Sequence, residues 1–266
     1  MALIFSAQVD ESGTDGRAGH TVLAGAVALP IQWDRLESNW GALLKRNGVA
    51  AFHSKEFKGR SGCFAGWSDF KRKRFTEAQA KIIYRHTAFQ VAVLIENATH
   101  DEIKKKMVGV KTYQPDSHYG MCFRVLMFRV CGQIEAMGKH EGFTGGKVQF
   151  LLESGPWGAN AAKIYEAEIN SIGSWRQSVY AHMLDGFGLI PKGKLHGLEA
   201  ADFLAAQALD DFERTGFLPE RDHRLGEVLD RPLLLEWHKD MLKEKERQRA
   251  HRQAYLGKKP AATGAI

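Results

Sequence analysis

Short strand-like segments alternate with longer amphipathic segments along most of the chain, and this alternation restricts the folds open to it. Apolar segments bounded by glycine, proline or charged residues predict strands at residues 2–9, 21–30, 89–97 and 145–153. Helical spacing predicts helices over residues 33–47, 68–86, 116–138, 160–172 and 195–216. Residues 178–185 favour a further strand at an edge of the sheet. The pattern therefore predicts one α/β domain with helical additions.

The first predicted strand ends on two adjacent carboxylates, Asp10 and Glu11. Residues 2–9 alternate between two faces, so these carboxylates should point to opposite faces if the strand continues. A short glycine-rich connection leads to the second strand, which predicts that the two strands are antiparallel neighbours. Asp, Ser and Gly are also common turn residues, so Asp10 indicates a site only together with other residues.

The composition of the 266-residue chain is that of an ordinary soluble globular protein, with 44% hydrophobic and 26% charged residues. Its length allows one large domain or two small ones. The N-terminal segment has no basic start and no long apolar run, so we expect no signal peptide, no membrane span and a cytoplasmic location. Three cysteines without CxxC spacing argue against a disulfide framework and a cysteine-based zinc site, and we expect reduced, mostly buried thiols.

The basic residues gather in clusters, although the formal net charge is a moderate +6. The clusters lie at residues 71–74, 104–106 and 243–253. They could contact the phosphates of a nucleic acid, or they could be the solvated faces of helices.

The predicted helix over 195–216 carries a carboxylate beside its apolar stripe, which consists of Leu198, Ala201, Ala205, Leu209 and Phe212. Asp202 falls at the edge of that stripe and should point toward the core. Glu199 lies one turn earlier and reaches the same region. A buried carboxylate needs a cation, a metal ion or a proton, so a salt bridge is the alternative to a metal site.

Glu153 and Asp10 both stand where a predicted strand ends. Open α/β sheets place their sites at the carboxyl ends of strands, so we expect these two side chains and Asp202 to converge. Several carboxylates around one point provide the hard oxygen ligands that Mg²⁺ or Mn²⁺ requires for phosphoryl transfer. The three acids therefore predict a divalent-metal site.

Sequence signatures of other chemistries are missing. The chain has no GxxxxGK[ST] or GxGxxG segment, so a glycine-rich nucleotide-binding loop has no support. Ser12 does not lie in a GxSxG segment, and Cys63 has no identifiable base partner. His182 and His196 lack the HExxH spacing of metalloproteases.

Five segments occur in the order of a known bacterial family; they are VDESG (9–13), AGAVAL (24–29), FHSKEF (52–57), VQFLLES (148–154) and GLEAADFLA (197–205). Through them the chain resembles the family catalogued as domain of unknown function 3800, over roughly residues 4–210. The resemblance implies an RNase H-like mixed sheet flanked by helices. Better-known proteins with that fold cut or join nucleic acid with two metal ions held by acidic residues. The family itself has no settled activity, so nuclease function is an analogy with the fold.

The resemblance also assigns residues. Asp10 matches the first-strand aspartate that bridges metals in RNase H-like enzymes, and Asp202 matches the acid on the last helix. Glu153 stands where the family usually has Asp, and Glu can still bind metal with a longer reach. Glu199 replaces a common Gln and could either add a ligand or only hydrogen-bond the backbone.

Two further residues, Glu11 and His53, match family positions that have no assigned role. Glu11 is adjacent to Asp10 and is therefore included among the candidate metal ligands. His53 could protonate a leaving oxygen or orient the substrate, and a hydrogen-bonded structural histidine is the alternative.

These residues predict a nuclease that hydrolyses phosphodiester bonds of DNA or RNA with Mg²⁺ or Mn²⁺ by a two-metal mechanism. A non-catalytic module that binds nucleic acid or protein on the same fold is the alternative. We expect the RNase H-like domain to span residues 1–216. A helical extension packed on it should span 217–256, and a disordered tail should span 257–266.

Overall fold

The computed structural model describes residues 3–14, 19–107, 116–170, 180–216 and 218, and the backbone of 224–229. The strands in this part of the chain are β1 (Ile4–Ser12), β2 (His20–Ala28), β3 (Phe89–Glu96), β4 (Lys147–Glu153), β5 (Leu184–Ile190) and β6 (Arg224–Leu229). The helices are α1 (Pro30–Asn47), α2 (Ser54–Lys58), α3 (Asp69–His86), α4 (Asn97–Met107), α5 (His118–Glu141), α6 (Pro156–Ile169) and α7 (His196–Thr215). Short 3₁₀ turns lie at Gly62–Phe64 and Ala181–Met183.

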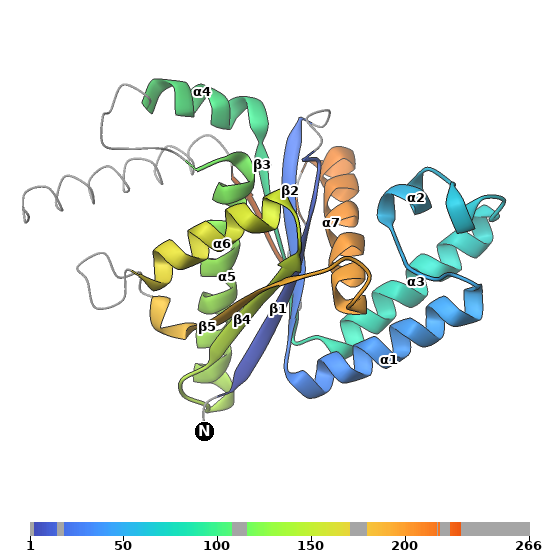
Figure 1. Ribbon diagram of the computed structural model, residues 1–266, viewed down its shortest axis with the longest axis horizontal. Coiled ribbons are helices and arrows are strands. Elements are labelled where there is room, and N and C mark those ends of the chain that lie inside the picture. The colour runs from blue at the N-terminus through green and yellow to red at the C-terminus, as the bar shows by residue number, and fades with distance from the viewer. Residues whose placement is uncertain are drawn as a thin grey trace, which may run out of the picture.

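The strands form one mixed sheet with the order β5-β4-β1-β2-β3-β6 (Figure 1). β2 runs antiparallel to both of its neighbours, β1 and β3, which confirms the predicted pairing of the first two strands. The pairs β1/β4, β4/β5 and β3/β6 are parallel. Every strand except β2 therefore ends at the same edge of the sheet.

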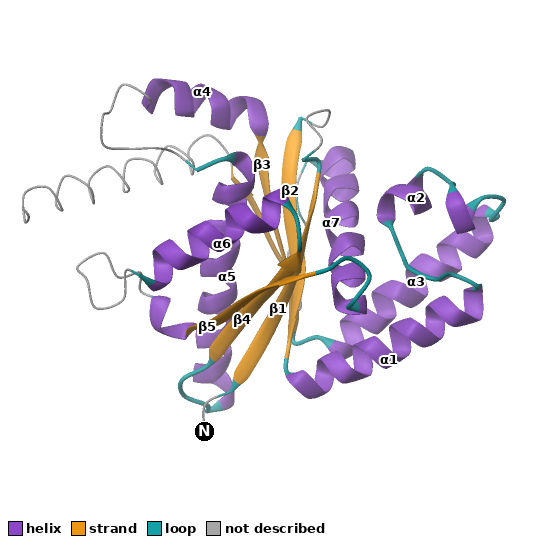
Figure 2. Cartoon of the chain, in the orientation of Figure 1, coloured by secondary structure: helices purple, strands orange, loops and turns teal. Residues whose placement is uncertain are grey.

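Helices cover both faces of the sheet, as Figure 2 shows. On one face, α5 and α6 pack on Phe5, Ala7 and Val9 of β1. On the other face, α1, α3 and α7 pack on the side of β2 formed by valine and alanine. Burial of these two apolar layers is the main favourable term in folding. The predicted mixed sheet flanked by helices is confirmed.

The start of α7 approaches β1 very closely. A Cβ atom at Gly197 would lie 2.3 Å from the Gln8 Oε1 atom, so only glycine fits at this point of contact. This packing brings the first two turns of α7 alongside the second half of β1. Asp202 is thereby carried toward the strand end that bears Asp10.

Two predicted helix ends are confirmed by their hydrogen bonds and backbone angles. The Ser68 hydroxyl accepts a hydrogen bond from the Lys71 N–H at the start of α3. Gly216 has φ of 77° just after α7, where a left-handed residue ends the helix.

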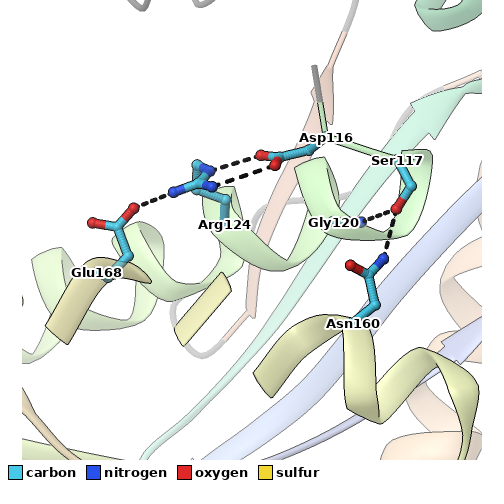
Figure 3. Close-up of polar contacts among 6 residues, drawn as sticks. All are labelled: Asp116, Ser117, Gly120, Arg124, Asn160 and Glu168. Atoms are coloured by element: carbon cyan, nitrogen blue, oxygen red, sulfur yellow. Dashed lines mark hydrogen bonds and ion pairs between the residues drawn. The ribbon is translucent and has the colours of Figure 1, made fainter. Parts of the chain in front are cut away.

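Several boundaries differ from the prediction. α6 begins at Pro156 rather than Asn160, because proline is well suited to the first position of a helix. The Asn160 side chain instead donates to the Ser117 hydroxyl (Figure 3). The edge strand was expected over 178–185, but β5 runs from Leu184 to Ile190 and pairs with β4.

The segment after α7 also differs from the expectation. A helical extension was predicted over 217–256, whereas residues 224–229 form β6. Pairing with β3 gives hydrogen-bond partners to backbone groups that would otherwise lie along an open edge. Apart from Leu218 and β6, this extension and the predicted tail at 257–266 lie outside the described residues. The domain boundaries remain a prediction.

A buried polar group joins α5 to α6 and is drawn in Figure 3. The Arg124 guanidinium lies between two carboxylates, with its Nε atom 2.7 Å from Asp116 Oδ2 and its Nη1 atom paired with Glu168. The Arg124 side chain is only 12% exposed. This group is therefore a desolvated ion cluster between packed helices.

Two further expectations concern cysteines and membranes. Cys122 and Cys131 are buried free thiols, as expected, whereas Cys63 is exposed. Within the described residues, no helix combines the length and the apolar character needed to cross a bilayer.

Candidate functional site

The six residues singled out in the sequence line one cleft at the carboxyl edge of the sheet. The cleft has a volume of about 710 Å³, and its lining includes Asp10, Glu11, His53, Glu153, Glu199 and Asp202. Lysine side chains also line it, namely Lys55, Lys58 and Lys192. Two strand ends and α7 therefore line one cleft, and the convergence of their acids on a common metal position remains a prediction.

Asp10 is the most strongly perturbed acid in the cleft. Burial is the main cause that raises the pKa of its carboxyl group well above the ordinary value, and the negative charges of Glu11 and Asp202 raise it further. Its Oδ1 atom accepts a hydrogen bond of 2.9 Å from the Glu11 N–H. No cationic side chain among the described residues lies within 4.0 Å of this carboxylate. Asp10 is thus a buried acid beside other acids.

Glu11 extends the same acidic group. Burial raises its pKa, and the charges of Glu153 and Asp202 act in the same direction. Gly13 follows with φ of 77°, a conformation that favours glycine, and also lines the cleft. The strand end predicted from the sequence therefore supplies two acids to the cleft.

Asp202 is held by the backbone that leads into α2. Its Oδ2 atom accepts a hydrogen bond of 2.8 Å from the Ser54 N–H, and its Oδ1 atom accepts a short one from the Ser54 hydroxyl. No lysine or arginine in the described ranges pairs with it. The salt bridge considered as the alternative for Asp202 is thus not found among these residues.

The carboxylate of Glu199 is buried and accepts hydrogen bonds from other parts of the protein. Its Oε2 atom accepts hydrogen bonds from Trp40 Nε1 at 2.9 Å and from the Phe52 N–H at 3.1 Å. Its Oε1 atom lies 3.3 Å from His196 Nδ1, and this contact is the main cause that raises the pKa of His196. Glu199 therefore links α1, α7 and the segment before α2, which is a positioning role; its part as a fourth metal ligand remains a prediction.

Glu153 stands at the end of β4 and is partly exposed. Its Oε1 atom lies 3.8 Å from Lys192 Nζ across the cleft mouth. A partly exposed pair at this distance contributes little to stability. Among the described residues, Glu153 is the one of the three principal acids that has a cationic neighbour.

His53 directly precedes α2 and lines the cleft. Its ring has no hydrogen-bond partner among the described residues, so the expectation of a hydrogen-bonded structural histidine gains no support. A role in protonation or orientation remains a prediction.

Sequence reasoning missed Glu37, which organises the start of α7. Its two carboxylate oxygens accept hydrogen bonds from the His196 N–H at 3.0 Å and the Gly197 N–H at 2.9 Å. A carboxylate at this position satisfies free N–H groups and is favoured by the helix dipole. Glu37 lies 159 residues before His196, so no local pattern could reveal this contact.

The cleft acids are close but not clustered. In the described part of the chain, the group of three whose ligand atoms all lie within 4.8 Å of one another is His100, Asp101 and His118, and no such group comes from the cleft. Carboxylates without a cation repel one another, and hydrogen bonds from Ser54 and Trp40 direct two of them toward the walls.

The donor set of the cleft nevertheless fits a hard divalent cation. Its charged ligands are carboxylate oxygens, which Mg²⁺ and Mn²⁺ prefer. Asp10 is buried with like charges and without a cation among the described residues, so a bound cation would compensate charge that this part of the protein leaves uncompensated.

The chain has distant matches among solved structures. No protein-family model matches the sequence, and no curated protein matches it. The chain is similar to a structure of Bst-RNase HIII in complex with Mn²⁺, with a TM-score of 0.41 and 11% identity. It is also similar to a mutant protein of Bst-RNase HIII, with a TM-score of 0.39 and 12% identity. Each match covers 82% of this chain and 57% of the other, so the chain spans little more than half the length of those proteins.

The described strands and helices confirm the predicted mixed sheet flanked by helices. The RNase H-like character of that sheet remains what the resemblance of sequence segments implies. Membership of the domain of unknown function 3800 family remains a resemblance of sequence segments.

Proposed function

We propose that the protein is a nuclease that hydrolyses phosphodiester bonds of DNA or RNA with Mg²⁺ or Mn²⁺ bound in the cleft. One observation carries the proposal: the half-buried Asp10 lies beside Glu11 and Asp202, with no cation of the described chain within 4.0 Å. Evolution seldom retains a group of partly desolvated like charges for stability, because each charge loses hydration and repels the others.

Asp10, Asp202 and Glu153 would hold the cations, with Glu11 and Glu199 as further candidate ligands. When bound in such a site, divalent cations activate water and stabilise the charge that develops on phosphate oxygens. Asp202 accepts hydrogen bonds from Ser54, and Glu199 accepts them from Trp40 and Phe52, so both carboxylates have defined positions in the cleft wall. These hydrogen bonds hold the acids in place before any substrate binds.

The lysines of the cleft would attract and orient the phosphate backbone. Lys58 is fixed by Asp210 at 2.6 Å and by the Ala206 carbonyl at 3.0 Å, so its ammonium group has a defined position on α2. Lys55 and Lys192 line the same cleft. His53, on the cleft wall beside Ser54, is the candidate that would protonate the leaving oxygen.

Basic residues outside the cleft support a nucleic-acid partner. Residues 71–74 lie on α3, and residues 104–106 lie on α4. Contacts from such residues to phosphates carry no base specificity, so affinity should fall steeply with salt concentration.

The test is cleavage of single-stranded, duplex and hybrid substrates with Mn²⁺, with Mg²⁺ and with EDTA. We expect cleavage of at least one substrate that requires metal. Asp10→Asn and Asp202→Asn should each lower the rate by about 10³-fold, which corresponds to roughly 4 kcal/mol of transition-state stabilisation. Asp34→Asn on the exposed side of α1 is the matched control and should keep the rate.

Two results would overturn the proposal. The first is cleavage that persists in EDTA or in Asp10→Asn, which would place the activity elsewhere. The second is salt-dependent binding of nucleic acid without cleavage of any substrate, which is the result that the binding-module alternative predicts.

A further inference from the structure

A second group of metal-binding side chains lies outside the cleft, where α4 and α5 begin. His100 and Asp101 belong to α4, and His118 is the first residue of α5. His118 Nε2 lies 2.9 Å from Asp101 Oδ1, and the rings of His100 and His118 meet edge to face with centroids 4.9 Å apart. One ligand atom from each residue lies within 4.8 Å of the other two.

We propose that His100, Asp101 and His118 form a binding site for a transition-metal ion of the Zn²⁺ type. Two imidazoles and one carboxylate are ligands that Zn²⁺ and related ions accept, whereas Mg²⁺ prefers oxygen ligands. Three protein ligands leave coordination positions for water or another donor. This site therefore differs in metal preference from the all-carboxylate cleft.

The positions of the three ligands are fixed by contacts outside the group. His100 is 0% exposed and shares the inner side of α4 with the buried Ile103. The start of α4 is tied to β2 by the Asn97 N–H, which donates to the Gly19 carbonyl at 2.9 Å, and by the Thr21 hydroxyl, which donates to Asn97 at 2.9 Å. A site held in this way loses little conformational freedom when it binds an ion.

The start of α5 is held in a similar way. The Ser117 hydroxyl accepts a hydrogen bond from the Gly120 N–H at 3.0 Å and another from the Asn160 side chain at 2.8 Å, as Figure 3 shows. These bonds join the first turn of α5 to α6. His118 thus has a defined backbone on which to present its ring.

The group also offers a path for an ion to enter. The side chain of Asp101 is 52% exposed and that of His118 is 29% exposed, while His100 lies beneath them. A metal site needs both ordered ligands and access from solvent, and this arrangement provides both.

A simple ion pair between protonated His118 and Asp101 is the alternative. His118 is the first residue of α5, and its ring contacts both the carboxylate of Asp101 and the ring of His100. A second imidazole therefore lies beside the carboxylate and the first imidazole. Two imidazoles and one carboxylate within reach of one point are a ligand set for a Zn²⁺-type ion, which favours the metal site.

One residue, Tyr119, connects the proposed site to the cleft. Tyr119 follows His118, and its ring stacks on the cleft residue Trp157 with centroids 5.5 Å apart. Burial raises the pKa of Tyr119, and the charges of Glu11 and Asp10 raise it further. An ion bound at His118 would hold the start of α5, and with it Tyr119, against the cleft wall.

The test is a titration of the metal-free full-length protein with Co²⁺ and Zn²⁺ in excess Mg²⁺, which saturates the carboxylate cleft. We expect one tight equivalent of Zn²⁺ and, with Co²⁺, visible absorption bands that Zn²⁺ abolishes. His118→Ala and Asp101→Asn should each weaken Zn²⁺ binding by at least about 100-fold, because loss of a ligand exceeds the 10- to 100-fold effect of outer contacts.

Both substituted side chains are partly exposed, so the fold should persist and can be checked by circular dichroism. His140→Ala, at the exposed far end of α5, is the matched control and should bind Zn²⁺ as the wild type does. Asp10→Asn should also leave Zn²⁺ binding unchanged, even if it abolishes cleavage. Unaltered Zn²⁺ affinity in His118→Ala, or loss of the tight equivalent in Asp10→Asn, would overturn the proposal without any bearing on the nuclease function.

Discussion

The protein holds two groups of buried acids that differ in how their charge is balanced. Between α5 and α6, Arg124 contacts Asp116 through Nε at 2.7 Å and Nη2 at 3.3 Å, and it contacts Glu168 through Nη1 (Figure 3). In the cleft, Asp10 and Asp202 have no cationic side chain of the described chain within 4.0 Å. Arg124 offsets the charge of the first group, whereas no described residue does so for Asp10 and Asp202.

The pKa shifts reflect the same difference. Burial raises the pKa of Glu168, and the charge of Asp116 adds to the rise, while the charge and hydrogen bond of Arg124 offset part of it. Burial also raises the pKa of Asp10, and there the neighbouring charges of Glu11 and Asp202 add to the rise. An arginine between two acids stabilises contact between helices, whereas acids without a cation leave a place for an ion from solution.

The largest expected effect tests whether Arg124 stabilises the protein by balancing the charges of Asp116 and Glu168. Arg124→Met removes the cation that contacts both Asp116 and Glu168 at a largely desolvated position, so the free energy of unfolding should fall by roughly 3–5 kcal/mol. Lys139→Met removes an exposed partner of Glu135 on the same helix and should cost no more than about 1 kcal/mol. Urea unfolding of both variants measures the difference. Similar small losses in both would show that the Arg124 cluster is not a stabilising one.

The next effect concerns the metal response of the cleft. Mn²⁺ at about 100 times its dissociation constant should stabilise the wild type by about 2.7 kcal/mol, because only the folded chain assembles the ligands. Asp10→Asn should lose most of that gain, while its stability in EDTA should equal or exceed that of the wild type. Thermal melts with EDTA and with Mn²⁺ test this, with Asp34→Asn as control. A strong loss of stability of Asp10→Asn in EDTA would show that Asp10 has a cationic partner.

A smaller effect is the pH dependence of the metal-free protein. The pKa of Asp10 is higher in the folded chain than in the unfolded chain, so folding favours the protonated acid. The free energy of unfolding should therefore fall as the pH rises from the ordinary pKa of an aspartate toward the pKa of Asp10 in the folded chain. Asp10→Asn should remove this part of the decline, so its advantage in EDTA should be absent below about pH 4 and grow above it. Urea unfolding across this range measures the difference. An advantage that is constant with pH would contradict the assigned cause.

The smallest expected effect concerns Lys192, which is the cationic neighbour of Glu153 among the described residues. Lys192→Gln breaks a partly exposed pair with Glu153 and should change the free energy of unfolding by less than about 1 kcal/mol. The affinity for nucleic acid should fall and become less sensitive to salt, because one phosphate contact is removed. Binding titrations at several salt concentrations test this. A loss of stability as large as that of Arg124→Met would make the two groups of acids alike.

The sequence by itself determined the elements that depend on neighbouring residues. The alternation in residues 2–9 predicted the first strand, and Ser68 and Gly216 marked helix ends that the structure confirms. Such signals are local, because caps and periodicity involve residues within one or two turns. The strand-end position of Asp10 and the stripe-edge position of Asp202 were visible for the same reason.

The tertiary structure alone decided which partners these residues meet. Glu199 finds Trp40 across 159 residues, and Asp202 finds Ser54 across 148. α4 carries little apolar surface and was not predicted, although it brings His100 and Asp101 to His118. Whether a carboxylate is paired, unpaired or placed beside an imidazole depends on packing between distant segments, and no local pattern in the sequence encodes that packing.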